Sequence, residues 1–189
     1  MTDARIKFQS VQSTLTTLRK AADAATFARF ADALSADARA AIERPPVAGN
    51  WVPVTWLDEA LRHGLDIIYG GSLPRMRQHG RDAITIDMSG PYKLFIKALS
   101  PAYVVSRVPL IWDQYYQHNG KMTVLSFDEK QRRIEVAFTG IVIPSVAFWQ
   151  NQLGTIEGTM LLTRLKNPVV SIVSGGTNEP DCAMVATYD

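Results

Sequence analysis

The sequence predicts an α+β fold in which a helical part, about residues 1–118, packs on a small antiparallel sheet formed within about residues 119–189. Two observations predict it. Apolar residues recur at steps of three and four through the first part, and they alternate with a period of two from residue 122 onward. The elements of the second part are expected in the order β-β-α-α-β-β. Alternating βαβ units, which indicate a parallel sheet, do not occur in this order.

A single domain spanning residues 1–189 is expected, because no Ser/Gly-rich or charged linker divides the chain. Its first 43 residues predict two or three short, Ala-rich helices. Leu15 and Leu18 begin one apolar stripe, and Phe27 and Phe30 begin another. The last of these helices ends before Pro45, since a residue that precedes proline is disfavoured in the helical conformation.

A turn at residues 49–54 carries Trp51 and separates these helices from the next ones. One-sided apolar stripes predict a helix from residue 55 to the glycine pair at 70–71, and another after Ser72. A third helical block follows Pro91, is interrupted at Ser100–Pro101, and resumes through residues 110–118. Asn119–Gly120 is typical of a helix end.

The second part begins with the clearest hairpin of the chain. Residues 122–126 and 134–138 alternate between apolar and polar, and the polar run 128–131 connects them. A helix is then expected from Ser145, with Gly154 breaking it and a second helix over residues 156–165. Two final strands are expected at residues 169–174 and 182–188.

No catalytic or metal-binding motif stands out, so we expect a protein that is not an enzyme and that needs no metal or cofactor. His63, His79 and His118 are scattered, and a zinc site normally needs three or four protein ligands. Phosphate-binding glycine loops and the G-x-S-x-G elbow are absent. The lone Cys182 begins an apolar strand and is interpreted as a core residue, with a nucleophile as the alternative.

Charge and hydropathy limit the classes of binding partner and the cellular location that we expect for this protein. The formal net charge is +2, with 20 basic and 18 acidic residues, and the basic residues form no extended stripe of the kind that neutralises nucleic-acid phosphates. No apolar run is long enough to cross a membrane, and the N-terminus lacks a signal-peptide core. One cysteine allows no internal disulfide, which fits a reducing compartment. The expected location is the cytoplasm.

The aromatic residues of the helical part offer the best candidates for function. Most of them are expected in the core, but a subset could line an apolar pocket between helices, or form a surface for a protein partner or a second copy of the chain. The candidates for a ligand pocket or an interface are Trp56, Tyr92, Phe95, Tyr103, Trp112, Tyr115 and Phe148.

Several short motifs occur in a recognisable order. Ile6-Lys7-Phe8 is followed by Trp51-Val52-Pro53-Val54, the Ser100-Pro101 break, Val108-Pro109-Leu110-Ile111-Trp112, and Gly154 and Gly158 in the form G-x-x-x-G. In this order the chain resembles an uncharacterised domain family abundant in myxobacteria. That family is in turn similar to the superfamily of 4-vinyl reductase, haem-NO-binding and TRAPP-type domains.

The resemblance implies a non-enzymatic regulatory or sensory module that binds a small apolar ligand or a protein partner through its helical half. A purely structural homodimeric domain is the alternative. Haem-binding relatives use a histidine on a helix before the sheet, and residues 95–108 contain none. The cysteine that carries an acyl chain in trafficking relatives is also missing from the helical part. The resemblance therefore supports the scaffold without haem.

Overall fold

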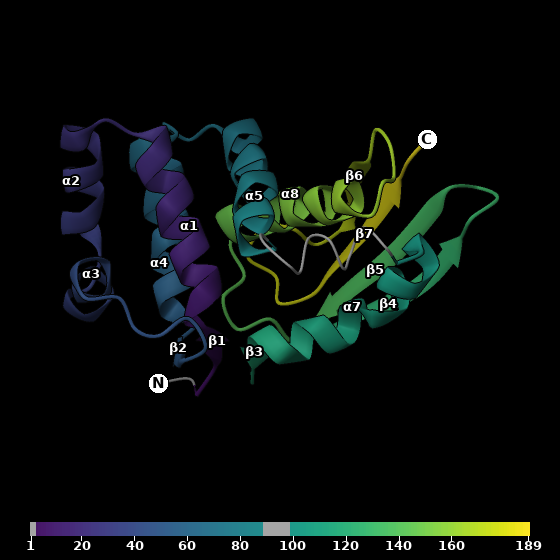
Figure 1. Cartoon of the computed structure of the whole chain (residues 1–189), viewed down its shortest axis with the longest axis horizontal. Helices are drawn as coiled ribbons and strands as arrows, with labels where there is room; N and C mark the ends of the chain where they lie inside the picture. Colours follow the sequence, from purple (N-terminus) through teal and green to yellow (C-terminus); the bar gives the residue numbers. More distant parts are fainter. Residues whose placement is uncertain (1–2, 89–98) are drawn as a thin grey trace.

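The computed structural model describes residues 3–88 and 99–189, and it confirms the α+β fold class (Figure 1). The helices are α1 (Phe8–Ala21), α2 (Ala24–Ala33), α3 (Ala36–Glu43), α4 (Thr55–His63), the π-helical turn η1 (Gly64–Ile68), α5 (Leu73–Asp87), α7 (Pro101–Tyr115) and α8 (Val146–Leu162). The strands are β1 (Arg5–Lys7), β2 (Trp51–Pro53), β3 (Tyr116–Gln117), β4 (Lys121–Asp128), β5 (Arg133–Thr139), β6 (Val169–Ser174) and β7 (Cys182–Thr187).

The predicted hairpin and the two final strands form one antiparallel sheet with the strand order β4-β5-β7-β6. The period-two pattern holds, because Ile134, Val136 and Phe138 are buried while the residues between them are more exposed. One face of this sheet therefore packs against the helices, as the sequence predicts.

A second, small sheet has the order β2-β1-β3 and lies within the part expected to be helical. The sequence predicts a turn at Trp51 and a helix that continues through Tyr116 to residue 118, whereas Trp51 and Tyr116 are both in strands. Both predictions are wrong for the same reason. Strands of two or three residues are too short to show the alternation that identifies a strand.

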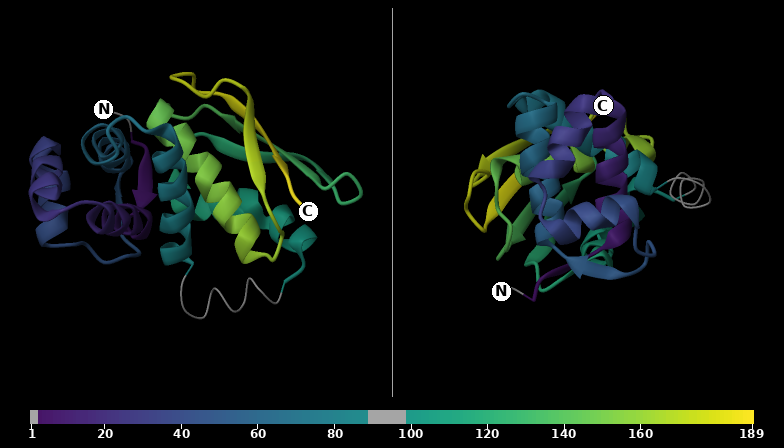
Figure 2. Two further views of the ribbon diagram at one scale, coloured as in Figure 1. Left: turned by 90° about the horizontal axis from the view of Figure 1, so that it is seen from above. Right: turned by 90° about the vertical axis from the view of Figure 1, so that its left-hand side faces the viewer.

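The elements follow one another in layers across the molecule (Figures 1 and 2). α2 and α3 lie at one end, followed by α1 and α4, then α5, then α8, and finally the four-stranded sheet. α7 packs against β4 while α8 packs against β6. Both helices thus cover the inner face of the sheet, and the space between them is where a cavity can form.

Helix α8 corrects the prediction of two helices between the hairpin and the final strands, because it runs unbroken through Gly154. Gly154 lies where α8 crosses α5, and a β-carbon at this position would collide with the backbone carbonyl of Arg77. Gly80 on α5 meets the backbone of Asn151 in the same way. The glycines therefore allow two helix backbones to touch, and Gly154 does not end a helix.

This crossing yields a first prediction. In an exposed helix, Gly154→Ala would stabilise the protein by about 1 kcal/mol, because alanine has the higher helix propensity. At this crossing we expect the opposite sign, a loss of about 3 kcal/mol, because the added methyl group has no space beside the Arg77 carbonyl. Urea unfolding at pH 7 measures the difference.

Gly49→Ala is the matched control for this variant, since nothing lies within 4 Å of a β-carbon there. The control is expected to unfold with the wild-type midpoint. A Gly154→Ala protein as stable as this control would show that the two helices do not need backbone contact.

A buried cluster of ion pairs also joins α8 to α5 and β6. Glu157 is 1% exposed, and its carboxylate pairs with Arg77 and Arg81 of α5. It also accepts a hydrogen bond of 3.1 Å from the backbone N–H of Val170 on β6. One carboxylate thus joins α5, α8 and the edge strand of the sheet.

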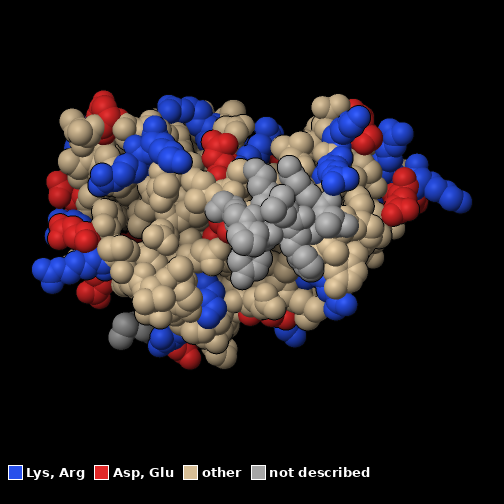
Figure 3. Space-filling model, in the orientation of Figure 1, with Lys and Arg blue, Asp and Glu red and all other residues tan. Residues whose placement is uncertain are grey.

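The surface carries charges of both signs. On the face shown in Figure 3, basic and acidic side chains are interspersed and do not gather into a basic stripe. Across residues 3–88 and 99–189, no helix is long and apolar enough to cross a membrane.

Candidate functional site

A cavity of about 940 Å³ lies between α7, α8 and the inner face of the sheet, and it reaches α1 and α5. Its walls are mainly apolar, and this volume is within the range of about 300–1,000 Å³ that is typical of small-molecule sites. The apolar lining includes Val104, Val105, Val108, Ile111, Trp112, Met122, Val124, Ile134, Val136, Ile156 and Met160.

The local sequence explains why these side chains face the same space. Val104, Val108 and Trp112 on α7 are four residues apart, so they share one face of the helix. On β4 and β5, alternation turns Met122 and Val136 to the inner face of the sheet. A helix stripe and a strand face thereby become two apolar walls.

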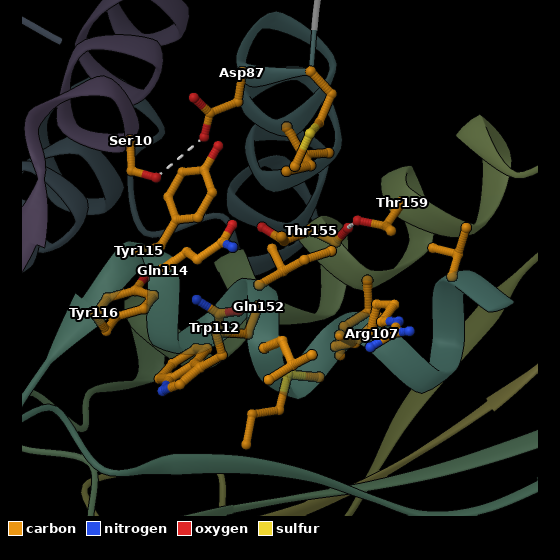
Figure 4. A pocket seen from close by; sticks show the side chains of 18 of the residues that line it. Ser10, Asp87, Arg107, Trp112, Gln114, Tyr115, Tyr116, Gln152, Thr155 and Thr159 are labelled. Atoms are coloured by element: carbon orange, nitrogen blue, oxygen red, sulfur yellow. Dashed lines mark hydrogen bonds between the residues drawn. The ribbon is translucent and has the colours of Figure 1, made fainter. Parts of the chain in front are cut away.

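One end of the cavity is polar (Figure 4). Ser10 of α1 donates a hydrogen bond of 3.1 Å from its Oγ to Oδ2 of Asp87, the last residue of α5. The side chain of Tyr115, at the end of α7, reaches the same place. Nε2 of Gln9 donates to the backbone carbonyl of Asp87 at 3.1 Å and to the Tyr115 hydroxyl at 3.4 Å. Helices α1, α5 and α7 thus meet around Asp87.

The carboxyl group of Asp87 is only partly satisfied. The residue is 8% exposed, and within the parts of the chain that the structure describes its Oδ1 has no hydrogen-bond partner. Burial raises the pKa of Asp87 from 3.8 to about 6, while the hydrogen bonds of Ser10 and Gln9 oppose this rise. At neutral pH the cavity therefore holds a buried negative charge.

The structure brings together three of the aromatic candidates. Tyr103, Trp112 and Tyr115 line the cavity, and the Trp112 ring stacks on Tyr116 with 4.1 Å between centroids. Trp56 is half-buried against the core and does not line the cavity.

Phe148 is fully buried, and its ring packs edge-on against Trp149 at 5.0 Å, away from the cavity lining. Tyr92 and Phe95 lie outside the described residues. Whether any of these aromatic residues binds a ligand or a partner stays a prediction.

Sequence reasoning missed Ser10 and Asp87. A signal was present, because Met76, Gly80, Ala83 and Asp87 follow one another at steps of four, three and four, and all four are buried. Asp87 therefore occupies a position on the inward stripe of α5 where an apolar side chain is expected.

The histidines and the cysteine lie elsewhere. Not one of His63, His79, His118 and Cys182 lines the cavity. His79 is buried, its Nδ1 lies 3.0 Å from the Tyr69 hydroxyl, and burial lowers its pKa to about 4. For residues 3–88 and 99–189, no group of three or more His, Cys, Asp or Glu side chains could hold a metal ion.

Cys182 is a buried residue at the start of β7. Burial raises the pKa of its thiol to about 11, and the charge of Glu179 adds to the effect. The thiol therefore remains protonated at neutral pH, and a protonated thiol is a poor nucleophile.

No protein-family model and no curated protein matches the sequence. Solved structures do match across nearly the whole chain. The crystal structure of an oxygen-binding H-NOX domain related to soluble guanylate cyclases is 12% identical, with a TM-score of 0.63 over 97% of this chain and 95% of that one. The Fe(II) unliganded H-NOX protein from K. algicida is 7% identical, with a TM-score of 0.68 over 97% of each chain.

A point mutant of the T. tengcongensis H-NOX is 12% identical, with a TM-score of 0.64 over 97% of this chain and 98% of that one. The chain has an H-NOX-like fold. This likeness confirms, for the fold, the haem-NO-binding part of the resemblance drawn from the sequence. Kinship with a myxobacterial family stays a prediction.

The H-NOX-like fold raises the question of whether the cavity suits a haem. Protein ligands to haem iron are commonly a histidine imidazole or a cysteine thiolate. All three histidines and the one cysteine of the chain are described, and all lie outside the cavity lining. Residues 89–98 contain neither type in their sequence. A haem held by histidine or cysteine therefore does not fit this cavity.

Proposed function

We propose that this protein is a non-enzymatic sensory module that binds a small, apolar, non-haem molecule in the cavity between α7, α8 and the sheet. The observation that carries the proposal is the cavity itself, with a volume of about 940 Å³ and mainly apolar walls. A concave, mainly apolar space of this size with a few polar groups at one end is typical of a small-molecule site.

The H-NOX-like fold supports the sensory part of the proposal. One structure of this fold is named as an oxygen-binding domain related to soluble guanylate cyclases. The same scaffold with no imidazole in its cavity is suited to a ligand that is held by packing and a few polar contacts, without coordination to iron. A protein partner and a homodimer stay predictions.

Haem binding is the first test. Haemin added in equal amount to the purified protein is expected to show the spectrum of haemin in buffer, with no sharpened Soret band and no saturation at one equivalent. Saturation at one equivalent with a Soret band typical of axial coordination would overturn the non-haem part of the proposal.

A cavity-filling variant tests the site. Thr155 of α8 points into the cavity (Figure 4). Leu161 on the same helix is 51% exposed and lies outside the lining. The wild type is expected to bind the neutral dye Nile red with a blue-shifted emission. Thr155→Trp is expected to weaken binding by about tenfold or more because the indole occupies the cavity, which corresponds to at least about 1.4 kcal/mol.

Leu161→Trp is the matched control, and it is expected to bind the dye as the wild type does. Equal binding by both variants would show that the dye is held elsewhere. Native mass spectrometry of protein purified from its own cells then looks for a retained apolar molecule.

A further inference from the structure

We propose that the ligand of this cavity is an apolar amine, and that its ammonium group binds the Asp87 carboxylate while its hydrocarbon body lies against α7, α8 and the sheet. The inference rests on the proposed function and adds the chemical class of the ligand. The evidence for it is a comparison of two buried carboxylates, one of which has charged partners in the structure and one of which does not.

The chain contains an internal comparison. Asp87 and Glu157 are the buried acidic residues among those the structure describes. Glu157 pairs with two arginines and accepts a backbone N–H bond, as a buried charge requires. Asp87 has only the neutral side chains of Ser10 and Gln9 as hydrogen-bond partners, and no ion pair, within the described parts of the chain.

Among the described residues, both cations that line the cavity are held by other groups. Nζ of Lys7 donates to the Gly49 carbonyl at 2.8 Å and lies 4.0 Å from the centre of the Trp51 ring. The Arg107 guanidinium lies 5.1 Å from the centre of the Tyr103 ring. Residues 3–88 and 99–189 therefore leave Asp87 without a counter-charge, and the cavity is a space through which a ligand can bring one.

Among the described residues, the fully buried side-chain atoms that line the cavity and lack a hydrogen-bond partner are acceptors. Besides Asp87 Oδ1, the Oδ1 of Asn151 is buried without a partner in the described part of the chain, and Asn151 is also a lining residue. A primary ammonium offers three donors and so suits an unmet carboxylate oxygen, whereas a carboxylate ligand offers none. Asp87 is buried, so such a bond is stronger there than at the surface.

The bond requires the ionised form of Asp87. Its pKa is raised to about 6 by burial, so the carboxylate fraction grows as the pH rises from 5 to 8, while a primary alkylamine remains protonated throughout. Among the described residues, the titratable groups that face Asp87 are the phenols of Tyr115 and Tyr116. Burial raises the pKa of Tyr116 above its ordinary value of 10, so it remains neutral in this range. Amine binding is therefore expected to tighten with pH.

Three ten-carbon probes that differ only in the head group test the inference: decylamine, decanol and decanoate, each below its micelle concentration, in competition with Nile red. At pH 8 the wild type is expected to bind decylamine about tenfold or more tightly than decanol, as befits a hydrogen bond to a charged group. Asp87→Asn is expected to lose this preference, so that it binds decylamine no more tightly than decanol. Asp82→Asn, on the exposed face of α5, is the control and keeps the preference.

The outcomes separate the two proposals. If all three probes displace the dye equally, or if decanoate is preferred, the amine inference fails and the apolar cavity site stands. A preference for decylamine that persists in Asp87→Asn also overturns the inference. If the wild type binds neither the dye nor any probe, the proposed function itself fails.

Discussion

Glu157→Gln is expected to lower the free energy of unfolding by about 3 kcal/mol at pH 7. Breaking a buried ion pair typically costs about 3–5 kcal/mol, because the partner is left without its counter-charge. The lower end applies here, since the side chains of Arg77 and Arg81 are 26% and 36% exposed and keep some access to water. Urea unfolding followed by circular dichroism measures the change.

The control for this variant is Glu135→Gln, which breaks a pair with Arg133 between side chains that are 34% and 42% exposed. A surface pair of this kind is worth less than about 1 kcal/mol. Equal losses in the two variants would mean that the buried cluster does not hold α8 in place.

The pH dependence of this variant follows from the shift of Glu157. Burial alone would raise the pKa of this carboxyl group, but the hydrogen bonds and charges of Arg77, Val170 and Arg81 outweigh burial and lower it. Its contribution to stability is thus present at neutral pH and is lost as the pH falls through the lowered pKa. The difference between Glu157→Gln and the wild type is expected to shrink in strong acid.

Asp87→Asn is expected to stabilise the protein at pH 8 by about 3 kcal/mol. The pKa of this carboxyl group rises from 3.8 to about 6 on folding, and one pKa unit corresponds to about 1.4 kcal/mol. A raised acid pKa means that folding becomes less favourable as the pH rises through this interval, because the folded state resists ionisation. Asparagine has no charge to bury. The stability gain of Asp87→Asn over the wild type is expected to fall to about half at pH 5 and to vanish near pH 3.

The stabilities of the wild type and Asp87→Asn must be compared at each pH, because His79 also makes the stability of each protein depend on pH. Burial lowers the pKa of this histidine to about 4, so both proteins lose stability as the pH falls below 6.5. The stability lost through His79 is the same in both proteins, so the difference between them reports on Asp87 alone. An Asn variant that is less stable than the wild type at pH 8 would show that the carboxylate is well solvated in the folded state.

Regular patterns in the sequence were enough to predict much of the fold. The hairpin of β4 and β5 was predictable because its alternation extends over many residues, and a long pattern of one period identifies one type of element. The prediction that Gly154 ends a helix was wrong because a glycine can have either of two opposite effects on a helix. It can end the helix, or it can let a second backbone approach, and only the position of α5 decides between these uses.

The candidate site was only half predictable. Trp112 and Tyr115 were found because aromatic residues at helical spacing are visible in the sequence itself. Ser10 and Asp87 are 77 residues apart, and their contact depends on how α1 packs against α5. Nothing in the local sequence of either residue specifies that packing, although an acid on the buried stripe of α5 marked the position as unusual.

The close crossing of α5 and α8 has a consequence for how the molecule can respond to a guest. Glycines put these two helices in direct backbone contact, so neither can slide without collision, and together they form a fixed frame on one side of the cavity. α7 is different, because Pro109 within it removes one hydrogen bond of the helix. We therefore expect a larger guest to be accommodated by displacement of α7. Tyr103 and Leu110, which are 45% and 51% exposed, would carry that displacement to the surface of the molecule.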